Sequence, residues 1–381
     1  MLEFDTLKIN LGLERVSAVL KELGEPQLQF KSIHVAGTNG KGSVCAMLTS
    51  ILIEAGKRTG RFTSPHLFEW NERITVNNNE IPDDELELLT TKIKNISKKL
   101  MLELTPFEII TCVAFQYFAE QKVEIAVIEV GMGGRLDATN VINPLASVIT
   151  NVDLDHTEYL GKKLVEIANE KAGIIKAGIP VFTAEKKAAV LAVIRQVCDK
   201  KGSELFLCEA EKGLQSGLQG KYQRENEAVA LKVAKWLNIK IGAIDTGLHN
   251  AKWPGRFQAI SRDPLIIVDG AHNPAGAKAL VDSLKELGIS EPTFILGFQG
   301  YKDIDSMLDV YALYAGNIIF TRSSHPQAFD PALDPKYSPR YIRDIKLAIK
   351  EAKKIGKPIV IAGSLFVVAD AFKLLDVGVN T

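Results

Sequence analysis

The sequence lacks several features that would each point to a particular class of protein. It has four cysteines but no CxxC pair, so a zinc site is not expected. No stretch of about 18 uninterrupted apolar residues occurs, so no membrane span is expected. The first residues, MLEFDTLKIN, have neither the basic region nor the apolar core of a signal peptide. These absences favour a cytoplasmic protein.

The chain also has no excess of charge of either sign, because 46 Lys and Arg residues balance 46 Asp and Glu residues. A net charge of zero provides no broad attraction to nucleic acid or to an anionic membrane, so neither is an expected partner. The 46% hydrophobic and 24% charged residues are ordinary for a globular protein. A length of 381 residues favours two domains over one.

What is present is a regular alternation of short apolar runs and helical patterns. The expected strands are residues 33–36, 125–130, 146–150 and 180–183 in the first part, and 265–268, 293–296, 317–321 and 358–362 in the second. Helical patterns such as 111–121 and 162–171 separate them. The alternation predicts an α/β fold in which helices cover both faces of a parallel sheet.

The Pro254-Gly255 pair is the predicted hinge between two domains, residues 1–253 and residues 254–381. Residues 209–227 are rich in Gly and Gln and only weakly patterned, so we expect an irregular connection within the first domain. The sequence contains no internal repeat and no low-complexity tract.

A glycine-rich turn joins the first expected strand to a helical pattern. Its residues are Gly37, Thr38, Asn39, Gly40, Lys41, Gly42 and Ser43. Glycines allow backbone N–H groups to approach a phosphate, and the start of the helix adds positive potential there. Lys41 suits the β- and γ-phosphates of ATP, and the Ser43 hydroxyl suits Mg²⁺. The match to GxxxxGK[ST] is imperfect at Val35 and Gly42, and a turn that binds no ligand is the alternative.

Oxygen-bearing side chains follow several of the expected strands. Glu129 lies near the end of an apolar run, where a carboxylate is costly unless it is paired or binds metal. Asp153, Asp155 and His156 follow the next strand, and Ser64 follows another strand pattern. Ligands of open α/β sheets bind at the carboxyl ends of the strands, so these positions favour a magnesium site. A simple Ser-Pro turn at Ser64 and a hydrogen-bonding His156 without metal are the alternatives.

Together these segments resemble the folylpolyglutamate synthase/dihydrofolate synthase family, within the Mur ligase superfamily. The matching strings in the first part are HVAGTNGKGS at 34–43, TSPHL at 63–67, NERI at 71–74, EVGMGGRLDATN at 129–140, DH at 155–156 and EKAGI at 170–174. In the second part they are WPGRFQ at 253–258, DGAHNP at 269–274 and GSLF at 363–366. The resemblance implies an N-terminal P-loop ATPase-like domain and a smaller C-terminal Rossmann-like domain, with the active site in the cleft between them.

The resemblance also implies roles for residues of the first domain. Lys41 and the backbone of the glycine-rich turn would hold the ATP phosphates. Ser64 and Glu129 would bind one Mg²⁺, and Glu129 and His156 would serve a second. Lys171 matches the lysine that is carbamylated in this family, and a carbamate would give it oxygens able to bind Mg²⁺. An ion pair of Lys171 with Glu170 is the alternative.

Further roles follow for residues later in the chain. Asn226 lies in a segment similar to the family's HQxxNA string, on the adenine side of the nucleotide. Arg256 and His272 would contact the nucleotide phosphates, a role that suits the planar fork of arginine. Asp269, His272 and Ser364 would help to bind the nucleotide or the incoming glutamate.

The implied activity is the ATP-dependent addition of L-glutamate to a folate-type carboxylate, tetrahydrofolate, dihydropteroate or both, through an acyl phosphate. The expected catalytic residues are Lys41, Lys171, Arg256 and His272. Phe107 and Glu108 are candidates for lining the folate site, and the alternative is that Phe107 is a core residue at a helix entry. The resemblance also favours a monomer.

Three other interpretations are open. A Mur ligase for UDP-linked precursors would carry a UDP-binding domain before the P-loop, and the segment before Gly37 is too short for one. A P-loop phosphotransferase acting on a hydroxyl substrate would not need the DGAHNP string at 269–274. A nucleotide-controlled switch would hydrolyse ATP or GTP slowly and without a second substrate.

Overall fold

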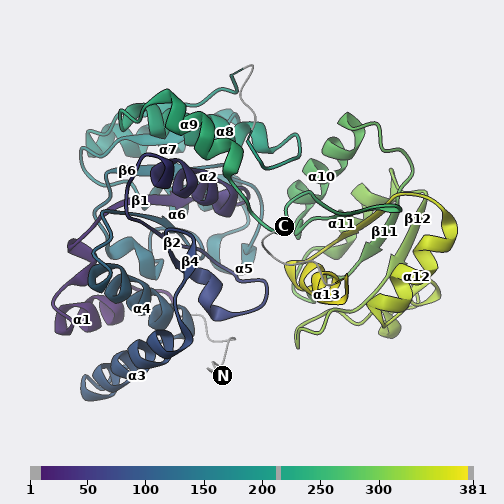
Figure 1. Ribbon diagram of the computed structural model, residues 1–381, viewed down its shortest axis with the longest axis horizontal. Coiled ribbons are helices and arrows are strands. Elements are labelled where there is room, and N and C mark those ends of the chain that lie inside the picture. The colour runs from purple at the N-terminus through teal and green to yellow at the C-terminus, as the bar shows by residue number, and fades with distance from the viewer. Residues whose placement is uncertain (1–9, 212–215, 376–381) are drawn as a thin grey trace. The chain divides into compact units, whose positions relative to one another are not determined.

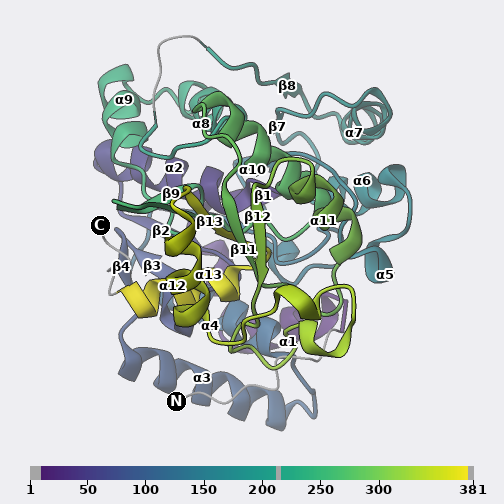
Figure 2. The same cartoon turned by 90° about the vertical axis from the view of Figure 1, so that its right-hand side faces the viewer.

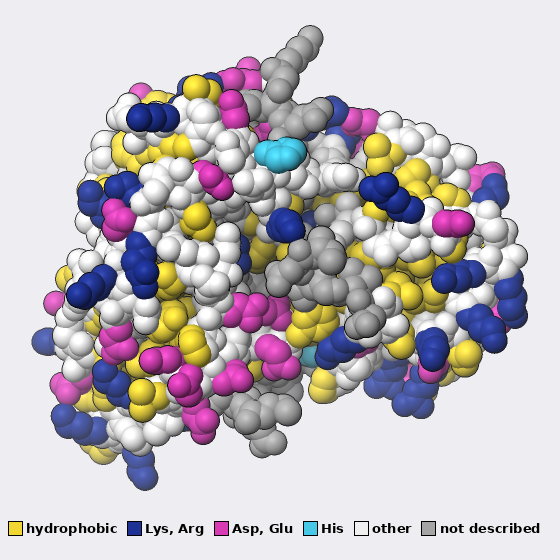
Figure 3. Space-filling model, in the orientation of Figure 1, with side chains coloured by type: hydrophobic (Ala, Val, Ile, Leu, Met, Phe, Trp, Pro, Cys, Tyr) yellow, Lys and Arg dark blue, Asp and Glu magenta, His cyan; other side chains and the backbone are white. Residues whose placement is uncertain are grey.

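The computed structural model describes residues 10–211 and 216–375, and the chain forms two compact units. The first unit comprises Met1–Ser216 and Glu225–Ala251, and the second comprises Gly217–Arg224 and Lys252–Thr381. Each unit combines helices with a mainly parallel sheet (Figure 1), which confirms the predicted α/β class. Figure 3 shows both basic and acidic side chains on the face that it draws. Within the described residues, no helix is both long enough and apolar enough to cross a membrane.

The described residues of the first unit form an eight-stranded sheet with the order β4-β3-β2-β5-β1-β6-β7-β8. The strands are β1 Lys31–Ala36, β2 Thr59–Phe62, β3 Ile74–Val76, β4 Asn79–Glu80, β5 Ile125–Glu129, β6 Ala146–Ile149, β7 Val181–Thr183 and β8 Leu205–Leu207. Neighbouring strands are parallel except at the edge, where β3 is antiparallel to β2 and to β4. Because β1 lies between β5 and β6, the segments that follow these three strands meet at one edge of the sheet.

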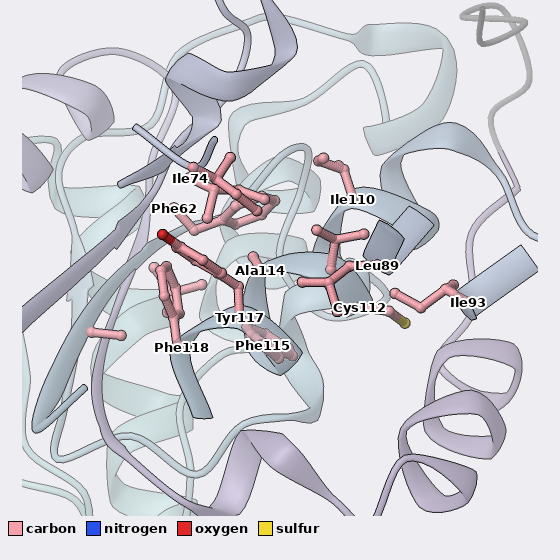
Figure 4. Close-up of a cluster of buried hydrophobic side chains, with 14 of the residues drawn as sticks. Phe62, Ile74, Leu89, Ile93, Ile110, Cys112, Ala114, Phe115, Tyr117 and Phe118 are labelled. Atoms are coloured by element: carbon pink, nitrogen blue, oxygen red, sulfur yellow. The ribbon is translucent and has the colours of Figure 1, made fainter. Parts of the chain in front are cut away.

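The helices of this unit are α1 Glu14–Glu22, α2 Lys41–Glu54, α3 Asp83–Lys99, α4 Pro106–Glu120, α5 Thr157–Leu160, α6 Leu164–Ala172, α7 Ala188–Lys201, α8 Gln223–Trp236 and α9 Ile241–Asn250. Two clusters of buried apolar side chains join some of them to the sheet. In one cluster, Leu89 of α3 and Phe115 of α4 meet Phe62 of β2 (Figure 4). The other cluster joins α6 and α7 to β6 and β7. Short 3-10 helices lie at Pro26–Leu28, Trp70–Arg73 and Ala138–Val141.

Helix α4 begins five residues before the helical pattern at 111–121, because local capping starts it at Pro106. The Thr105 hydroxyl accepts a hydrogen bond from the Glu108 N–H at 3.2 Å, and the Glu108 carboxylate accepts one from the Thr105 N–H at 2.7 Å. Proline at the first helical position loses no hydrogen bond there. A capping box of this kind is worth roughly 1 kcal/mol, and here it fixes where the helix enters the core.

The second unit contains a five-stranded sheet in its described residues, with the order β12-β11-β13-β10-β9. The strands are β9 Gln258–Arg262, β10 Leu265–Val268, β11 Thr293–Leu296, β12 Asn317–Phe320 and β13 Ile359–Ala362, and only β9 is antiparallel. The helices are α10 Pro274–Glu286, α11 Ile304–Ala312, α12 Ile345–Ile355 and α13 Leu365–Leu375, with 3-10 helices at Pro331–Leu333 and Ser338–Arg340. Helices α10 and α11 lie on one side of the strands, and α12 and α13 lie on the other (Figure 2).

The segment 209–227 differs from the irregular connection that the sequence predicted. Helix α8 already begins at Gln223, and Gly217–Arg224 belongs to the second unit rather than the first. The Lys221 N–H donates a hydrogen bond to the Ser283 hydroxyl at 2.9 Å, and Tyr222 packs on the core of the second unit. The residues at 212–215 lie outside the described part of the chain. Polar and charged residues at 224–227 hid the start of the helical pattern, because an amphipathic helix is recognised by its apolar residues.

Gly247 of α9 allows this helix to pack directly on α2, the helix that follows the glycine-rich turn. A Cβ at Gly247 would lie 2.4 Å from the Cα of Ile51, which is backbone and cannot swing aside. We predict that Gly247→Ala forces the helices apart and lowers the free energy of unfolding by about 1–3 kcal/mol. Urea denaturation of the variant and the wild type measures this difference.

Gly242 provides the matched control in the same helix, because a Cβ there would meet nothing within 4 Å. Gly242→Ala is expected to leave stability unchanged or to raise it by up to about 1 kcal/mol, through the lower backbone entropy of the unfolded chain. Equal destabilisation by both substitutions would contradict the close approach of α9 and α2.

Candidate active site

The turn between β1 and α2 is too tight to hold side chains at two of its positions. Gly40 has a φ of 84°, in the left-handed region that favours glycine. A Cβ at Gly40 would lie 2.2 Å from Oδ1 of Asn226, and one at Gly37 would lie 1.8 Å from Oγ1 of Thr150. The Val44 N–H donates to the Gly40 carbonyl at 2.9 Å and so begins the hydrogen-bond ladder of α2. The N–H groups in the first turn of a helix precede this ladder and are the groups that bind phosphate.

The segment that follows β6 holds this turn in shape. The Thr38 N–H donates to the Asn151 carbonyl at 2.8 Å, and the Asn39 N–H donates to the Asn151 side-chain oxygen at 2.9 Å. The Thr150 hydroxyl donates to the Asn39 carbonyl at 2.6 Å. The Asp153 N–H donates to the Thr38 hydroxyl at 2.9 Å. The sequence offered no signal for Thr150 or Asn151, because polar residues after a strand are common in loops.

Glu129 ends β5 beside the turn and is 3% exposed. Its Oε2 accepts a hydrogen bond from the Ser64 N–H at 3.1 Å, and its Oε1 lies 4.0 Å from Nζ of Lys41. The Lys41 ammonium also donates to the Thr38 carbonyl at 3.2 Å. Three of the expected site residues, Lys41, Ser64 and Glu129, thus lie together, and Ser43 is buried in the first turn of α2.

Lys171 of α6 is buried at 4% exposure, and its Nζ donates to the Gly37 carbonyl at 2.9 Å. Burial lowers the pKa of this ammonium to about 7, and the positive charge of Lys41 acts in the same direction. The alternative pair with Glu170 does not form, because the Glu170 carboxylate binds Arg135 at 2.8 Å. Lys171 therefore places an amine that is partly neutral at neutral pH directly against the glycine-rich turn.

His156 lies at the left-handed start of α5, with a φ of 49° and a side chain that is 35% exposed. Its N–H donates to Oδ1 of Asp155 at 2.9 Å, and its Nε2 lies 4.0 Å from the same oxygen. Asp153 instead forms an ion pair with Lys187 at 3.0 Å. In the described part of the chain, no three His, Cys, Asp or Glu side chains form a group that could hold a metal ion.

Asn226 comes from α8, far along the chain, and is 5% exposed. Its side-chain amide lies directly against the turn, because Oδ1 takes the space that a side chain at Gly40 would need. The similarity to the HQxxNA string thus corresponds to a residue that lies at the glycine-rich turn.

Phe107 and Glu108 at the start of α4 have separate surroundings. The Phe107 ring covers Gly131, where a Cβ would lie 2.5 Å from Cζ of the ring, and it packs 5.9 Å from the ring of Phe62. Glu108 is 2% exposed and forms an ion pair with Arg15 at 2.8 Å in addition to its capping bonds. Glu108 is therefore occupied within the fold, whereas the Phe107 ring lies against the backbone just after the end of β5.

A group of one cationic and two aromatic side chains, Arg73, His66 and Trp70, follows β2. The sequence predicted no role for any of them, although His66 lies in the string TSPHL and Arg73 in the string NERI. The guanidinium carbon of Arg73 lies 4.2 Å from the centre of the Trp70 ring, and Nε of Arg73 donates to Nδ1 of His66 at 2.9 Å. The rings of His66 and Trp70 are 4.9 Å apart. Burial lowers the pKa of Arg73 to about 10, and the charge of Glu129 opposes this effect.

A buried chain of hydrogen bonds shapes the loop that follows Glu129. Asp137 accepts from the Met132 N–H at 2.9 Å and from the Thr139 hydroxyl at 2.5 Å. Because Thr139 gives its proton to Asp137, it must accept from Nε2 of His34, which lies 2.8 Å away. Burial lowers the pKa of His34 to about 3, so the imidazole is neutral with its proton on Nε2.

The second unit gathers its expected site residues around Asp269, at the end of β10. Asp269 is 3% exposed and accepts hydrogen bonds from the Phe257 N–H at 2.8 Å, the Ala271 N–H at 2.8 Å and the Tyr222 hydroxyl at 2.7 Å. Arg256 covers the next residue, because a Cβ at Gly270 would lie 1.9 Å from its Nη1. The Asp269 carboxylate thus has its partners within the second unit.

His272 and Ser364 lie in the two loops next to this arrangement. Nδ1 of His272 lies 2.8 Å from the Gly270 carbonyl. The Ser364 hydroxyl, at 1% exposure, accepts from the Val367 N–H at 3.2 Å and so caps the start of α13. The geometry therefore supports a structural role for Ser364.

Comparisons with known proteins extend over nearly the whole chain. Residues 35–250 match the Mur ligase middle domain, and residues 255–365 match the Mur ligase, glutamate ligase domain. The dihydrofolate synthase/folylpolyglutamate synthase of Bacillus subtilis is 35% identical over 96% of this chain and 95% of its own length. The folylpolyglutamate synthase of Lacticaseibacillus casei is 35% identical over 92% of this chain and 91% of its own length.

Solved structures agree with these sequence matches. The E. coli FolC protein in complex with DHPP and ADP aligns with a TM-score of 0.90 and 30% identity, covering 98% of this chain and 95% of that one. The Mycobacterium tuberculosis folylpolyglutamate synthase complexed with ADP and AMPPCP aligns with a TM-score of 0.87 and 30% identity, covering 96% and 95%.

The shape of the glycine-rich turn can be tested at Gly40. We predict that Gly40→Ala weakens ADP binding at least about tenfold, because the new methyl group meets Asn226 and disturbs the N–H groups that face the phosphates. Isothermal titration calorimetry with ADP measures the affinity. Gly56→Ala is the matched control, since Gly56 also has a positive φ, of 76°, but nothing lies within 4 Å of a Cβ there. Equal ADP affinity in the two variants would contradict this account of the turn.

Proposed function

The chain belongs to the dihydrofolate synthase/folylpolyglutamate synthase family of the Mur ligases, and we propose that it joins L-glutamate to a folate-type carboxylate with ATP. It is a ligase that forms C–N bonds. The observation that carries the assignment of the site is the meeting of Lys41, Glu129 and Lys171 around one glycine-rich turn at the carboxyl edge of the sheet. That arrangement suits a triphosphate, because the Lys41 cation and the N–H groups at the start of α2 lie at the turn.

The proposed reaction proceeds in two steps. A carboxylate oxygen of the acceptor attacks the γ-phosphorus of ATP, the bond to the β-phosphate oxygen breaks, and an acyl phosphate and ADP result. The amine of glutamate then attacks the acyl carbon, the carbon–oxygen bond to phosphate breaks, and the nitrogen loses a proton as the amide forms. Activation is required because a carboxylate oxygen is a poor leaving group until it carries phosphate. Phosphoryl transfer depends mainly on positioning and charge neutralisation, so no side-chain nucleophile is needed.

Residues of both units are assigned to the binding of the nucleotide. The N-terminus of α2 and Lys41 are assigned to the β- and γ-phosphates, and Asn226 is assigned to the adenine side. We propose that Arg256 and His272 of the second unit contact the phosphates as well, which requires the two units to meet around the nucleotide. Closure of this kind would keep water away from the acyl phosphate.

Three residues near the glycine-rich turn fit a magnesium ion. Glu129 provides a buried carboxylate, and the hydroxyls of Ser43 and Ser64 are the further protein oxygens that we assign to the ion. Mg²⁺ usually keeps several waters and takes few protein ligands. When bound, the ion neutralises phosphate charge during transfer. His156 is proposed to serve a second ion together with Glu129, and its Nε2 lies 4.0 Å from Oδ1 of Asp155.

Lys171 is proposed to carry a carbamate. Its amine nitrogen attacks CO₂, a proton leaves to solvent, and the product keeps one N–H that can still donate to the Gly37 carbonyl. Only the neutral amine reacts, and a pKa of about 7 supplies it at neutral pH. The carbamate replaces a buried cation by an anion beside Lys41, which relieves the repulsion between the two ammonium groups. Its oxygens would then complete the surroundings of Mg²⁺.

The carbamate predicts a response to bicarbonate that depends on pH. In CO₂-free buffer, added bicarbonate should raise the rate of ADP release more at pH 8 than at pH 6, because the Lys171 amine loses its proton as the pH rises through about 7. Lys171→Ala should remove both the response and most of the activity. Lys176→Ala is the control, because this half-buried lysine donates to the Asn140 carbonyl away from the turn. A response that survives in Lys171→Ala would disprove the modification.

The acceptor site is proposed to include Phe107. Its ring covers the backbone at Gly131, close to the end of β5, and could stack on a pterin or aminobenzoyl group. The cation at Arg73, held over Trp70, adds a positive charge on the neighbouring strand connection that would attract an acidic acceptor.

The activity is tested by ADP release with ATP, Mg²⁺ and L-glutamate, comparing dihydropteroate, tetrahydrofolate and no acceptor. Release should require both glutamate and a pterin-bearing acceptor, and mass spectrometry should find a product that is one glutamate heavier. Lys41→Ala should lower kcat by about 100- to 1000-fold, whereas the exposed Lys57→Ala should not. ADP release that needs no acceptor would favour a switch or a phosphotransferase and would overturn the ligase assignment.

A further inference from the structure

Tyr222 contacts the Asp269 carboxylate of the second unit, although it lies far in the sequence from the other residues around that carboxylate. Its hydroxyl donates to Oδ2 of Asp269 at 2.7 Å. The tyrosine comes from Gly217–Arg224, the short segment that joins the second unit although the chain before and after it belongs to the first. Burial and the charge of Asp269 raise the pKa of the Tyr222 hydroxyl well above its ordinary value, so the group stays a donor at every physiological pH.

The oxygen that accepts from Tyr222 also shapes the backbone beside Arg256. Oδ2 of Asp269 accepts from the N–H of Phe257, the residue that follows Arg256 in the chain. Phe257 has a φ of 45°, a left-handed conformation that is unfavourable for a residue with a bulky side chain. Such a conformation persists only where the surroundings hold it. Asp269 supplies that support, and its orientation therefore decides the path of the chain at Arg256.

The direction of the Arg256 side chain is set by the same group of residues. Its Nη1 lies where a side chain at Gly270 would be, and Gly270 itself is tied to Gly255 by an N–H to carbonyl bond of 2.8 Å. The positive charge of Arg256 stabilises the Asp269 carboxylate, and it opposes the burial that raises the pKa of this group. A change in the orientation of the Asp269 carboxylate thus alters both the backbone at Phe257 and the charge interaction that hold the Arg256 guanidinium in place.

We propose that Tyr222 is a positioning residue for phosphoryl transfer, which orients Asp269 and through it places the Arg256 guanidinium. The proposal rests on the proposed function, in which Arg256 contacts the phosphates. In the segment similar to HQxxNA, Tyr222 occupies the histidine position, so this chain fills that position with a different ring, one that bears a hydroxyl. Four residues later Asn226 contacts the turn at Gly40. Residues 222–226 therefore include both Asn226, which contacts the glycine-rich turn, and Tyr222, which donates to the Asp269 carboxylate beside Arg256.

The test is a double-mutant cycle between Tyr222→Phe and Arg256→Ala, measured as kcat and as KM for ATP in the ligation assay. Tyr222→Phe keeps the ring and removes one hydrogen bond to a charged group, and kcat should fall by about ten- to a hundredfold. In the Arg256→Ala background the same substitution should cause no further loss, because the residue through which Tyr222 acts is gone. A merely structural tyrosine would lower kcat equally in both backgrounds.

Two further variants make the outcome unambiguous. Tyr314→Phe removes the hydroxyl of another tyrosine of this unit, which donates to the Ile289 carbonyl, and it should keep the wild-type kcat. Tyr222→His retains a ring N–H donor and should keep more activity than Tyr222→Phe, and it also serves if the phenylalanine variant does not fold. Equal losses in Tyr222→His and Tyr222→Phe would overturn the role of the donated hydrogen bond.

The cycle also separates this proposal from the proposed function. If Arg256→Ala keeps full activity, the assignment of Arg256 to the phosphates is wrong, and the positioning role falls with it. If Arg256→Ala loses activity while Tyr222→Phe equals the wild type, the ligase mechanism stands and only the role of Tyr222 is disproved.

Discussion

The turn between β1 and α2 must expose backbone N–H groups, and the first unit is arranged around that requirement. No side chain fits at Gly37 or Gly40, because the places where a Cβ would lie are taken by Thr150 and Asn226. The turn has no side chains at these positions that could pack and fix its shape, so the segment after β6 holds it with hydrogen bonds. The Thr150 hydroxyl donates to the Asn39 carbonyl, and the Asn39 N–H donates to the Asn151 side chain. In the proposed function, a phosphate is bound by groups whose geometry already exists before the nucleotide arrives.

Charge is concentrated at the same place. The buried Glu129 carboxylate lies beside Lys41, and the buried Lys171 amine lies against the turn itself. Bringing an ammonium out of water beside another cation lowers the pKa of Lys171 to about 7 from an ordinary value of 10.5, a change that corresponds to several kcal/mol in favour of the neutral amine. Asp155 and Asp137 oppose this effect, so the amine has anionic neighbours as well as the Lys41 cation. A neutral amine at this position is the form that the proposed carbamate requires.

The second unit also contains a buried charged group, but other residues stabilise it. Its buried carboxylate, Asp269, is stabilised by three donors and by the charge of Arg256. A carboxylate with this many partners is better suited to holding the surrounding backbone than to binding a substrate. The same logic applies to Ser364, whose hydroxyl caps α13. Asp269 and Ser364 thus serve the scaffold, whereas we propose that Arg256 and His272 contact the ligand.

Local patterns alone determined the α/β class, the strands at the centre of both sheets and the glycine-rich turn, because strand and helix periodicities and glycine spacing are properties of neighbouring residues. They also placed Lys41 and Glu129 correctly at the ends of adjacent elements. Only the tertiary structure decided which distant segments support them. Thr150, Asn151 and Tyr222 carry no signal of their own, and Glu108 becomes a buried partner of Arg15 through a contact between residues 93 apart in the chain. Long-range contacts of this kind depend on how helices and strands pack, so a buried carboxylate can be foreseen from the sequence but its partner cannot.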